Sequence, residues 1–159
     1  MTKRAVLLEA LLSTPSDIRR IIGSMELRLG ASPEDQGSPL QAAEILFGLI
    51  RTEQEYQAVI RDSINSSDGI LPIKDMASSE LISLTELGET FQNIREQTLN
   101  LLRRLKPAEW QRAIRGPAKA NLTVRYYVQA LVENDIEQTS QLVKLVHAHR
   151  HKLIGDKKS

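Results

Sequence analysis

The chain has 159 residues and no cysteine, and its 21 lysines and arginines against 20 aspartates and glutamates leave a formal net charge of +1. This length predicts one domain, residues 1–159, with a core that is stable without disulfides. The lack of cysteine excludes thiolate catalysis and cysteine-ligated zinc. The near-neutral charge gives no reason to expect nucleic-acid binding, and no stretch reaches the roughly 18 apolar residues of a membrane span.

The N-terminal segment begins with basic residues that are followed by apolar ones, as a signal peptide does. Glu9 interrupts the apolar run and no small-residue cleavage site follows, so we interpret the segment as a helix start in a cytoplasmic protein. The pattern predicts a helix over 3–29 with a break or kink at 14–17, because Pro15 has no N–H to donate. Its apolar stripe consists of Ile18, Ile21, Ile22, Met25 and Leu29.

A second helix is predicted to begin at Ser38. Serine at the N-cap, Pro39 after it and Gln41 three residues on make a capping box. The residues 66–72 contain serine, aspartate, glycine and proline, and we expect a loop there. The apolar stripe of the second helix consists of Ile45, Leu49, Thr52, Tyr56 and Val59.

A third helix is predicted over 79–105, where Pro107 stops it, and a fourth over 123–151. The connection over 107–120 carries the only tryptophan, Trp110, and is long enough to permit a crossover. Few aromatic residues and almost no alternation of period two indicate an all-α protein, and four helices of this length predict a four-helix bundle. The stripe of the fourth helix is Val124, Tyr127, Leu131, Gln138, Leu142 and Leu145.

Two polar residues, Asn134 and Gln138, interrupt the apolar face of the fourth helix. Their i, i+4 spacing places both side chains on one side of the helix, one turn apart. A pair of metal-binding histidines needs the same geometry, so the pattern is that of a metal site without its ligands. Alternatively, the two amides hydrogen-bond to each other or to Thr52, since buried amides need partners, or they fix the helix register.

Three segments carry a resemblance to DinB-like proteins. Residues 38–53 resemble the signature helix of that family, in which a capped start precedes Glu-Ile-Leu-x-His-Leu. Residues 105–110 resemble its segment after the third helix, and 122–142 resemble its last helix, where His-Asp-x-x-His falls. The resemblance covers nearly the whole chain. It implies an up-down-down-up four-helix bundle in a stress-related superfamily in which dimers are common.

Many DinB-like proteins hold a divalent metal with three histidines, and some are thiol-dependent transferases or hydrolases. The resemblance places the three ligand positions at Gly48, Asn134 and Gln138, and none of them is a histidine. Amide oxygens bind zinc, nickel or iron poorly, and glycine has no side chain. We therefore predict no metal and no cofactor at this site, although Asp135 and Glu137 of the family pattern are retained.

The side chains predicted to line a pocket at these positions are Thr52, Tyr56, Tyr127 and Asp135. Both tyrosines lie on apolar stripes, so packing in the core is the alternative interpretation of them. Asp135 lies at the edge of the stripe of the fourth helix, and it is the only titratable group of the pocket that could act as an acid or base near neutral pH.

Carboxylates could supply oxygen ligands for a more weakly bound metal such as Mg²⁺. Asp135 is the best placed for this role, and Glu44 and Glu53 on the second helix could contribute. Glu133 and Glu137 lie one turn apart but away from the apolar stripe, so we expect them to face solvent.

The histidines His147, His149 and His151 lie at the C-terminal end of the last predicted helix. We interpret them as cationic side chains that interact favourably with the helix dipole. The spacing of His147 and His151 also suits a zinc clip, but with no third protein ligand such a site would be weak. Four arginines are interpreted as a solvated face or a docking point for an anion: Arg103, Arg104, Arg112 and Arg115.

The sequence thus predicts a metal-free, DinB-like bundle that binds a small molecule or a partner protein without catalysis. We expect a cytoplasmic homodimer that binds neither nucleic acid nor membrane. The alternative is a divergent metal- or thiol-dependent transferase or hydrolase with a site rebuilt from Asn134, Asp135, Gln138 and Tyr56. A third hypothesis is a purely structural bundle whose centre is closed by side chains.

Overall fold

The computed structural model describes residues 3–29, 37–64, 83–114 and 122–156. Among them no strand occurs, and one isolated bridge pairs Ala113 with Thr123. The all-α class predicted from the sequence is therefore confirmed for these residues. None of the described helices combines the length and the hydropathy that a membrane crossing requires. The helices are α1 (Arg4–Leu29), α2 (Gly37–Ile64), α3 (Leu84–Arg103), α4 (Pro107–Trp110) and α5 (Val124–Asp156).

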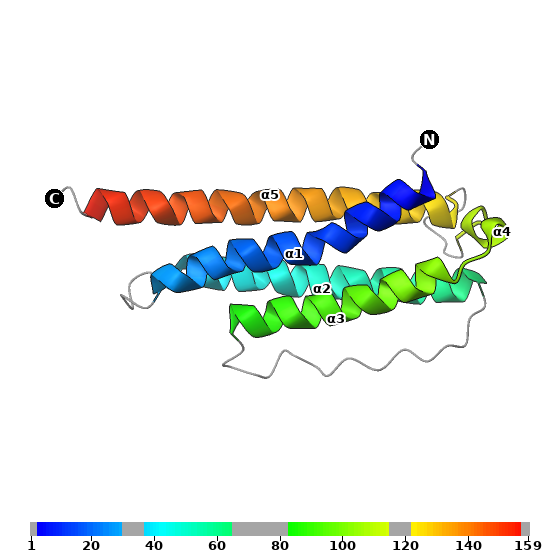
Figure 1. The fold of residues 1–159 in the computed structure, drawn as a ribbon, viewed down its shortest axis with the longest axis horizontal. Helices are drawn as coiled ribbons and strands as arrows, with labels where there is room; N and C mark the ends of the chain where they lie inside the picture. The colour runs from blue at the N-terminus through cyan, green and yellow to red at the C-terminus, as the bar shows by residue number, and fades with distance from the viewer. Residues whose placement is uncertain (1–2, 30–36, 65–82, 115–121, 157–159) are drawn as a thin grey trace.

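The four long helices lie side by side along their lengths (Figure 1). In this view α1 and α5 run from right to left, whereas α2 and α3 run from left to right. Both α1 and α2 pack extensively against α3 and α5, so α1 lies diagonally opposite α2. Because α2 and α3 are parallel, the chain crosses from one end of the bundle to the other between them.

The crossover thus follows the second helix and not the third, where the sequence permitted one. The end of α3 and the start of α5 lie at the same end of the bundle, with the short helix α4 between them along the chain (Figure 1). Pro107, expected only to stop a helix, is also the first residue of α4. After α4, the bridge between Ala113 and Thr123 brings the chain to the start of α5. Residues 113 and 123, on either side of the connection, are therefore neighbours in space.

Most helix bounds lie within a few residues of the predicted ones. α2 begins at Gly37, so Ser38 lies in its first turn and is not its N-cap. α3 is capped by Ser83, whose side chain accepts a 3.1 Å hydrogen bond from the N–H of Glu86. The predicted helix start at residue 79 and the predicted loop over 66–72 lie outside the described residues.

The helix α1 is continuous through Pro15, so of the break or kink predicted at 14–17 the break does not occur. A proline inside a helix leaves the carbonyl four residues earlier without its helical donor. That carbonyl belongs to Leu11, and it accepts a 2.9 Å hydrogen bond from Arg95 on α3. A tertiary contact therefore replaces the helical hydrogen bond that the proline removes.

The buried apolar side chains form two clusters, one toward each end of the bundle. The first includes Leu7, Leu11, Ile60, Leu99, Leu102, Trp110, Tyr127 and Leu131. The second includes Ile18, Ile22, Leu46, Leu49, Leu87, Phe91 and Leu142. On each long helix a buried polar residue lies between the two clusters, namely Thr14, Glu53, Arg95 and Asp135. These four residues position the candidate site.

Candidate functional site

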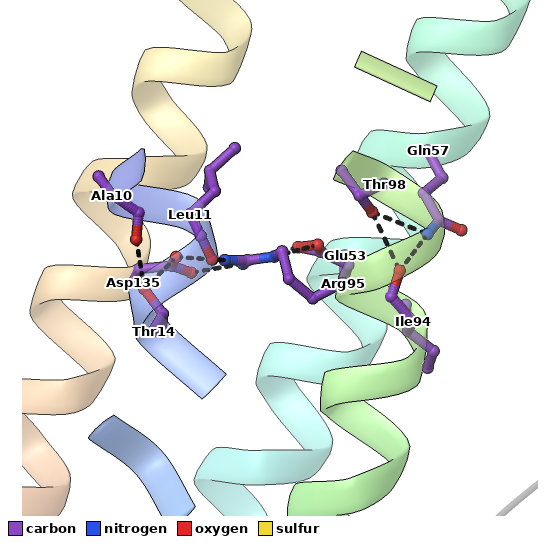
Figure 2. A network of polar contacts seen from close by, with 9 residues as sticks. All are labelled: Ala10, Leu11, Thr14, Glu53, Gln57, Ile94, Arg95, Thr98 and Asp135. Atoms are coloured by element: carbon purple, nitrogen blue, oxygen red, sulfur yellow. Dashed lines mark hydrogen bonds and ion pairs between the residues drawn. The ribbon is translucent and has the colours of Figure 1, made fainter. Parts of the chain in front are cut away.

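A charged network crosses the centre of the bundle between the two apolar clusters (Figure 2). Arg95 on α3 lies between Glu53 on α2 and Asp135 on α5, and the three residues are 1%, 0% and 3% exposed. Nε and Nη2 of Arg95 donate to the Glu53 carboxylate at 2.5 and 2.9 Å. Nη1 and Nη2 donate to the Asp135 carboxylate at 2.7 and 2.8 Å. Each carboxylate is thus held by two charge-assisted hydrogen bonds, the strongest kind available to side chains.

The network also includes the backbone and a hydroxyl of α1. Nη1 of Arg95 donates to the carbonyl of Leu11, so all five N–H groups of the guanidinium have an acceptor. The hydroxyl of Thr14 lies 2.9 Å from Oδ2 of Asp135 and 3.1 Å from the carbonyl of Ala10. All four long helices therefore meet at one guanidinium.

The pKa of the Arg95 guanidinium is raised above its ordinary value. Burial alone lowers this pKa, but the hydrogen bond to Asp135 and the charge and hydrogen bonds of Glu53 outweigh the effect of burial. Arg95 is therefore a permanent cation between two carboxylates. Both carboxylates are already bound, so neither is free to ligate Mg²⁺ as the sequence suggested for Glu53 and Asp135.

A second polar link joins α2 and α3 beside the charged network (Figure 2). Nε2 of Gln57, a residue that is 1% exposed, donates to the carbonyl of Ile94 at 2.9 Å. The same nitrogen donates to the hydroxyl of Thr98 at 2.8 Å. This link holds the two parallel helices in register next to Arg95.

This geometry places Asp135 in the buried charged network. The sequence predicts a pocket-lining residue at the edge of the stripe of the last helix, but Asp135 faces the centre of the bundle with Leu131 and Leu142. Successive helical positions differ by about 100°, so the neighbouring Asn134 faces another side, where it is partly buried. Asn134 and Asp135 therefore face different sides of α5.

Arg95 was not among the predicted site residues. A signal existed, because Arg95 lies one turn from Phe91 and one turn from Leu99, on the buried face of α3. A charged residue on such a face needs a buried partner of opposite charge. Glu53 and Asp135 lie in the same way on the buried faces of their own helices, and the three together define the network.

Two of the predicted ligand positions, Gly48 and Gln138, come together across the seam between α2 and α5. Both line a groove of about 490 Å³. The other residues that line it are Gln41, Glu44, Ile45, Gln141, Lys144 and Leu145. Asp135, which the sequence predicts to line the pocket, is not part of the lining of this groove.

The remaining predicted residues follow the same seam away from the groove. The rings of Tyr56 and Tyr127 stack across it, with centroids 4.0 Å apart and planes inclined by 10°. Thr52 and Asn134 are partly buried and lie between this stack and the groove along α2 and α5. Among the described residues no hydrogen bond joins Asn134 to Gln138 or either of them to Thr52, so the predicted pairing of the two amides is not formed.

Gly48 lies in the interior of α2, where a glycine costs about 0.5–1 kcal/mol relative to alanine. A Cβ at this position would meet no heavy atom of the described surroundings within 4 Å. Packing therefore does not require a glycine here. The missing side chain leaves open space in the wall of the groove.

The other predicted metal-binding and charged residues are dispersed. Among the described residues no three histidine, cysteine, aspartate or glutamate side chains gather to hold a metal ion. Glu133 and Glu137 are exposed, as the sequence predicts. His147 is exposed, and the side chains of His149 and His151 lie outside the described part. Arg103, Arg104 and Arg112 are exposed, and Arg115 lies outside the described residues.

A second groove, of about 390 Å³, lies between α1 and α3 beside Arg95. Nη1 of Arg19 donates to Oε1 of Gln92 at 2.7 Å within it. Because the N–H groups of Arg95 are all occupied, this arginine has no donor left for a ligand. The α2/α5 groove, by contrast, contains neither Arg95 nor the pair of Arg19 and Gln92.

Comparisons with known proteins give no match to a protein-family model, to a curated protein or to a solved structure. The groove offers amide donors and acceptors, one carboxylate and one ammonium group. These groups suit recognition by hydrogen bonds and charge, while the buried carboxylates serve to hold Arg95.

Replacing Arg95 by methionine is expected to lower the free energy of unfolding by about 3–5 kcal/mol, because two carboxylates lose their buried cation. The matched control is Arg20→Met, since Arg20 is 78% exposed and pairs with Asp17 within one helix. A surface pair of this kind contributes about 0–1 kcal/mol. Urea unfolding followed by circular dichroism measures both variants, and equal losses would contradict the structural role of Arg95.

A triple variant distinguishes lost charge compensation from lost shape. In Glu53→Leu/Arg95→Met/Asp135→Leu no charge stays buried at the centre, so most of the stability lost in Arg95→Met should return. If the triple variant is less stable than Arg95→Met, shape and hydrogen bonding outweigh charge at this position.

The stacked tyrosines predict a loss of stability at alkaline pH. Burial raises the pKa of Tyr127 to about 12, with smaller contributions from Tyr56 and Glu55. Burial, and next the charge of Glu133, raise the pKa of Tyr56 above 10.0. A folded pKa above the unfolded one contributes stability that is complete below pH 10 and is lost as pH rises through about 12.

Tyr127→Phe is therefore expected to lose less stability than the unaltered protein between pH 10 and 12. Unfolding free energies over this range measure the two slopes, and the range from pH 7 to 9 serves as the control, where the curves should be parallel. Equal slopes above pH 10 would mean that Tyr127 does not ionise with a raised pKa.

Proposed function

We propose that this protein is a DinB-like, up-down-down-up bundle that binds a small molecule in the α2/α5 groove without metal catalysis. The likeness of residues 38–53 and 122–142 to that family supports the assignment. The parallel course of α2 and α3 is consistent with it (Figure 1). A homodimer in the cytoplasm belongs to the same proposal.

One observation carries the proposal. Gly48 and Gln138, which the resemblance aligns with metal ligands of the family, line one groove. Neither residue supplies an imidazole, and the neighbouring carboxylates Glu53 and Asp135 are bound to Arg95. What the groove retains is open space at Gly48 and several amide groups. That combination favours a binding site over a metal centre.

The alternative, an enzyme with a rebuilt site, has less support. A catalytic acid or base works best with a pKa near the operating pH. The carboxylate of Asp135 is held by Arg95 and Thr14, away from the groove. The pKa of Tyr56 is raised by burial, which moves its hydroxyl further from neutral pH.

Filling the space at Gly48 tests the proposal. A thermal-shift screen of amino acids, amides, amines and carboxylates identifies binders of the unaltered protein, and Gly48→Leu should abolish their binding without unfolding the chain. Gly23→Leu is the matched control, because Gly23 lies in the interior of α1 and its Cβ would also meet nothing within 4 Å. Binding that survives Gly48→Leu would place the ligand elsewhere.

Restoring the histidines tests the family assignment. Gly48→His/Asn134→His/Gln138→His should bind one Zn²⁺, and at 100 times the Kd the metal should stabilise the fold by about 2.7 kcal/mol. The control is Gly48→His/Glu133→His/Glu137→His, which has the same spacing on α5 but on exposed positions. Calorimetric titration compares the two variants, with the unaltered protein as the background. Equal affinities would mean that the three positions do not converge as in DinB-like proteins.

A further inference from the structure

Two opposite charges lie on the walls of the α2/α5 groove without pairing with each other. Glu44 lines the α2 wall and Lys144 lines the α5 wall. Both side chains are exposed, and neither forms an ion pair within 4.0 Å with a residue that the structure describes. The groove thus has one carboxylate and one ammonium group on opposite walls, and both charges face solvent.

The surface between the two charges offers further contacts. Gln138 and Gln141 line it from α5, and neither side chain is hydrogen-bonded to another described residue. Ile45 and Leu145 add apolar surface, one from each helix. The volume of about 490 Å³ lies within the range of about 300–1,000 Å³ typical of small-molecule sites.

We propose that the groove binds a small zwitterion, an amino-acid-like molecule with one ammonium and one carboxylate group. Its ammonium pairs with Glu44, its carboxylate pairs with Lys144, and its aliphatic part lies on Ile45 and Leu145. The inference rests on the proposed function, because it requires the groove to be a small-molecule site.

The same two charges explain why a zwitterion is favoured over a singly charged molecule. A simple amine attracted by Glu44 is repelled by Lys144, and a simple carboxylate is repelled by Glu44. A zwitterion forms one ion pair with Glu44 and one with Lys144, so both charges of the groove have a partner. Because the charges are exposed, the binding is weak and falls as salt is added.

The test is a titration of the ¹⁵N-labelled full-length protein, followed by NMR, with glycine, 4-aminobutanoate and 6-aminohexanoate. These probes scan the separation of the two charges, and butylamine, butanoate and butanamide are the controls that lack one or both. We expect one amino acid to bind more tightly than every control, with shifts at Gly48 and Gln138. Glu44→Gln or Lys144→Gln should each weaken it about three- to fivefold.

Exchanging the charges of Glu44 and Lys144 tests whether the two charges act as a pair. Glu44→Lys/Lys144→Glu keeps one charge of each sign on the groove, so it should bind the same probe in the opposite orientation with nearly unaltered affinity. Glu55→Gln, an exposed position of α2 outside the groove, should have no effect.

Two results would overturn the inference. If butylamine, butanoate or butanamide shifts the groove resonances as strongly as the best amino acid, the groove binds small molecules but does not select zwitterions. If none of the probes shifts these resonances, zwitterion binding is excluded, and the proposed function is then judged by the library screen and Gly48→Leu alone.

Discussion

The burial of Arg95 between Glu53 and Asp135 is the constraint on which the rest of the bundle depends. Removing three charges from water costs several kcal/mol per ion, and this cost is offset only if each group finds its hydrogen-bonding partners. Those partners come from α1, α2 and α5, so the network is complete only when all four long helices have their native register. The apolar clusters on either side tolerate small shifts more readily, because the hydrophobic effect has no direction.

The same constraint divides the polar residues of α2 and α5 into two sites. Glu53 and Asp135 point toward the centre of the bundle, where both form ion pairs with Arg95. On the adjoining faces of these helices lie Gly48 and Gln138, whose groove is open to ligands. Because Arg95 binds both Glu53 and Asp135, the buried network joins α2 and α5, the two helices that form the walls of the groove. The chemistry of the groove is set by amides and by one carboxylate and one ammonium group.

Sequence patterns alone were sufficient for the helices and insufficient for the charged centre. The periodicity of apolar residues predicted the four long helices, because each must bury one face. Pro15 predicts a break or kink, because local rules do not show that Arg95 supplies the missing donor to Leu11. The sequence predicts Asp135 at the edge of the apolar stripe, whereas in the structure it faces the centre of the bundle beside Arg95.

By itself the sequence determined the helical class, the approximate helix bounds and the absence of histidine at positions 48, 134 and 138. These features depend on residue identity and on contacts a few residues apart. Only the tertiary structure decided that Glu53, Arg95 and Asp135 meet, and that Gly48 faces Gln138 across a groove. The partners come from different helices, and their distances depend on how those helices pack. No local pattern along the chain encodes that packing.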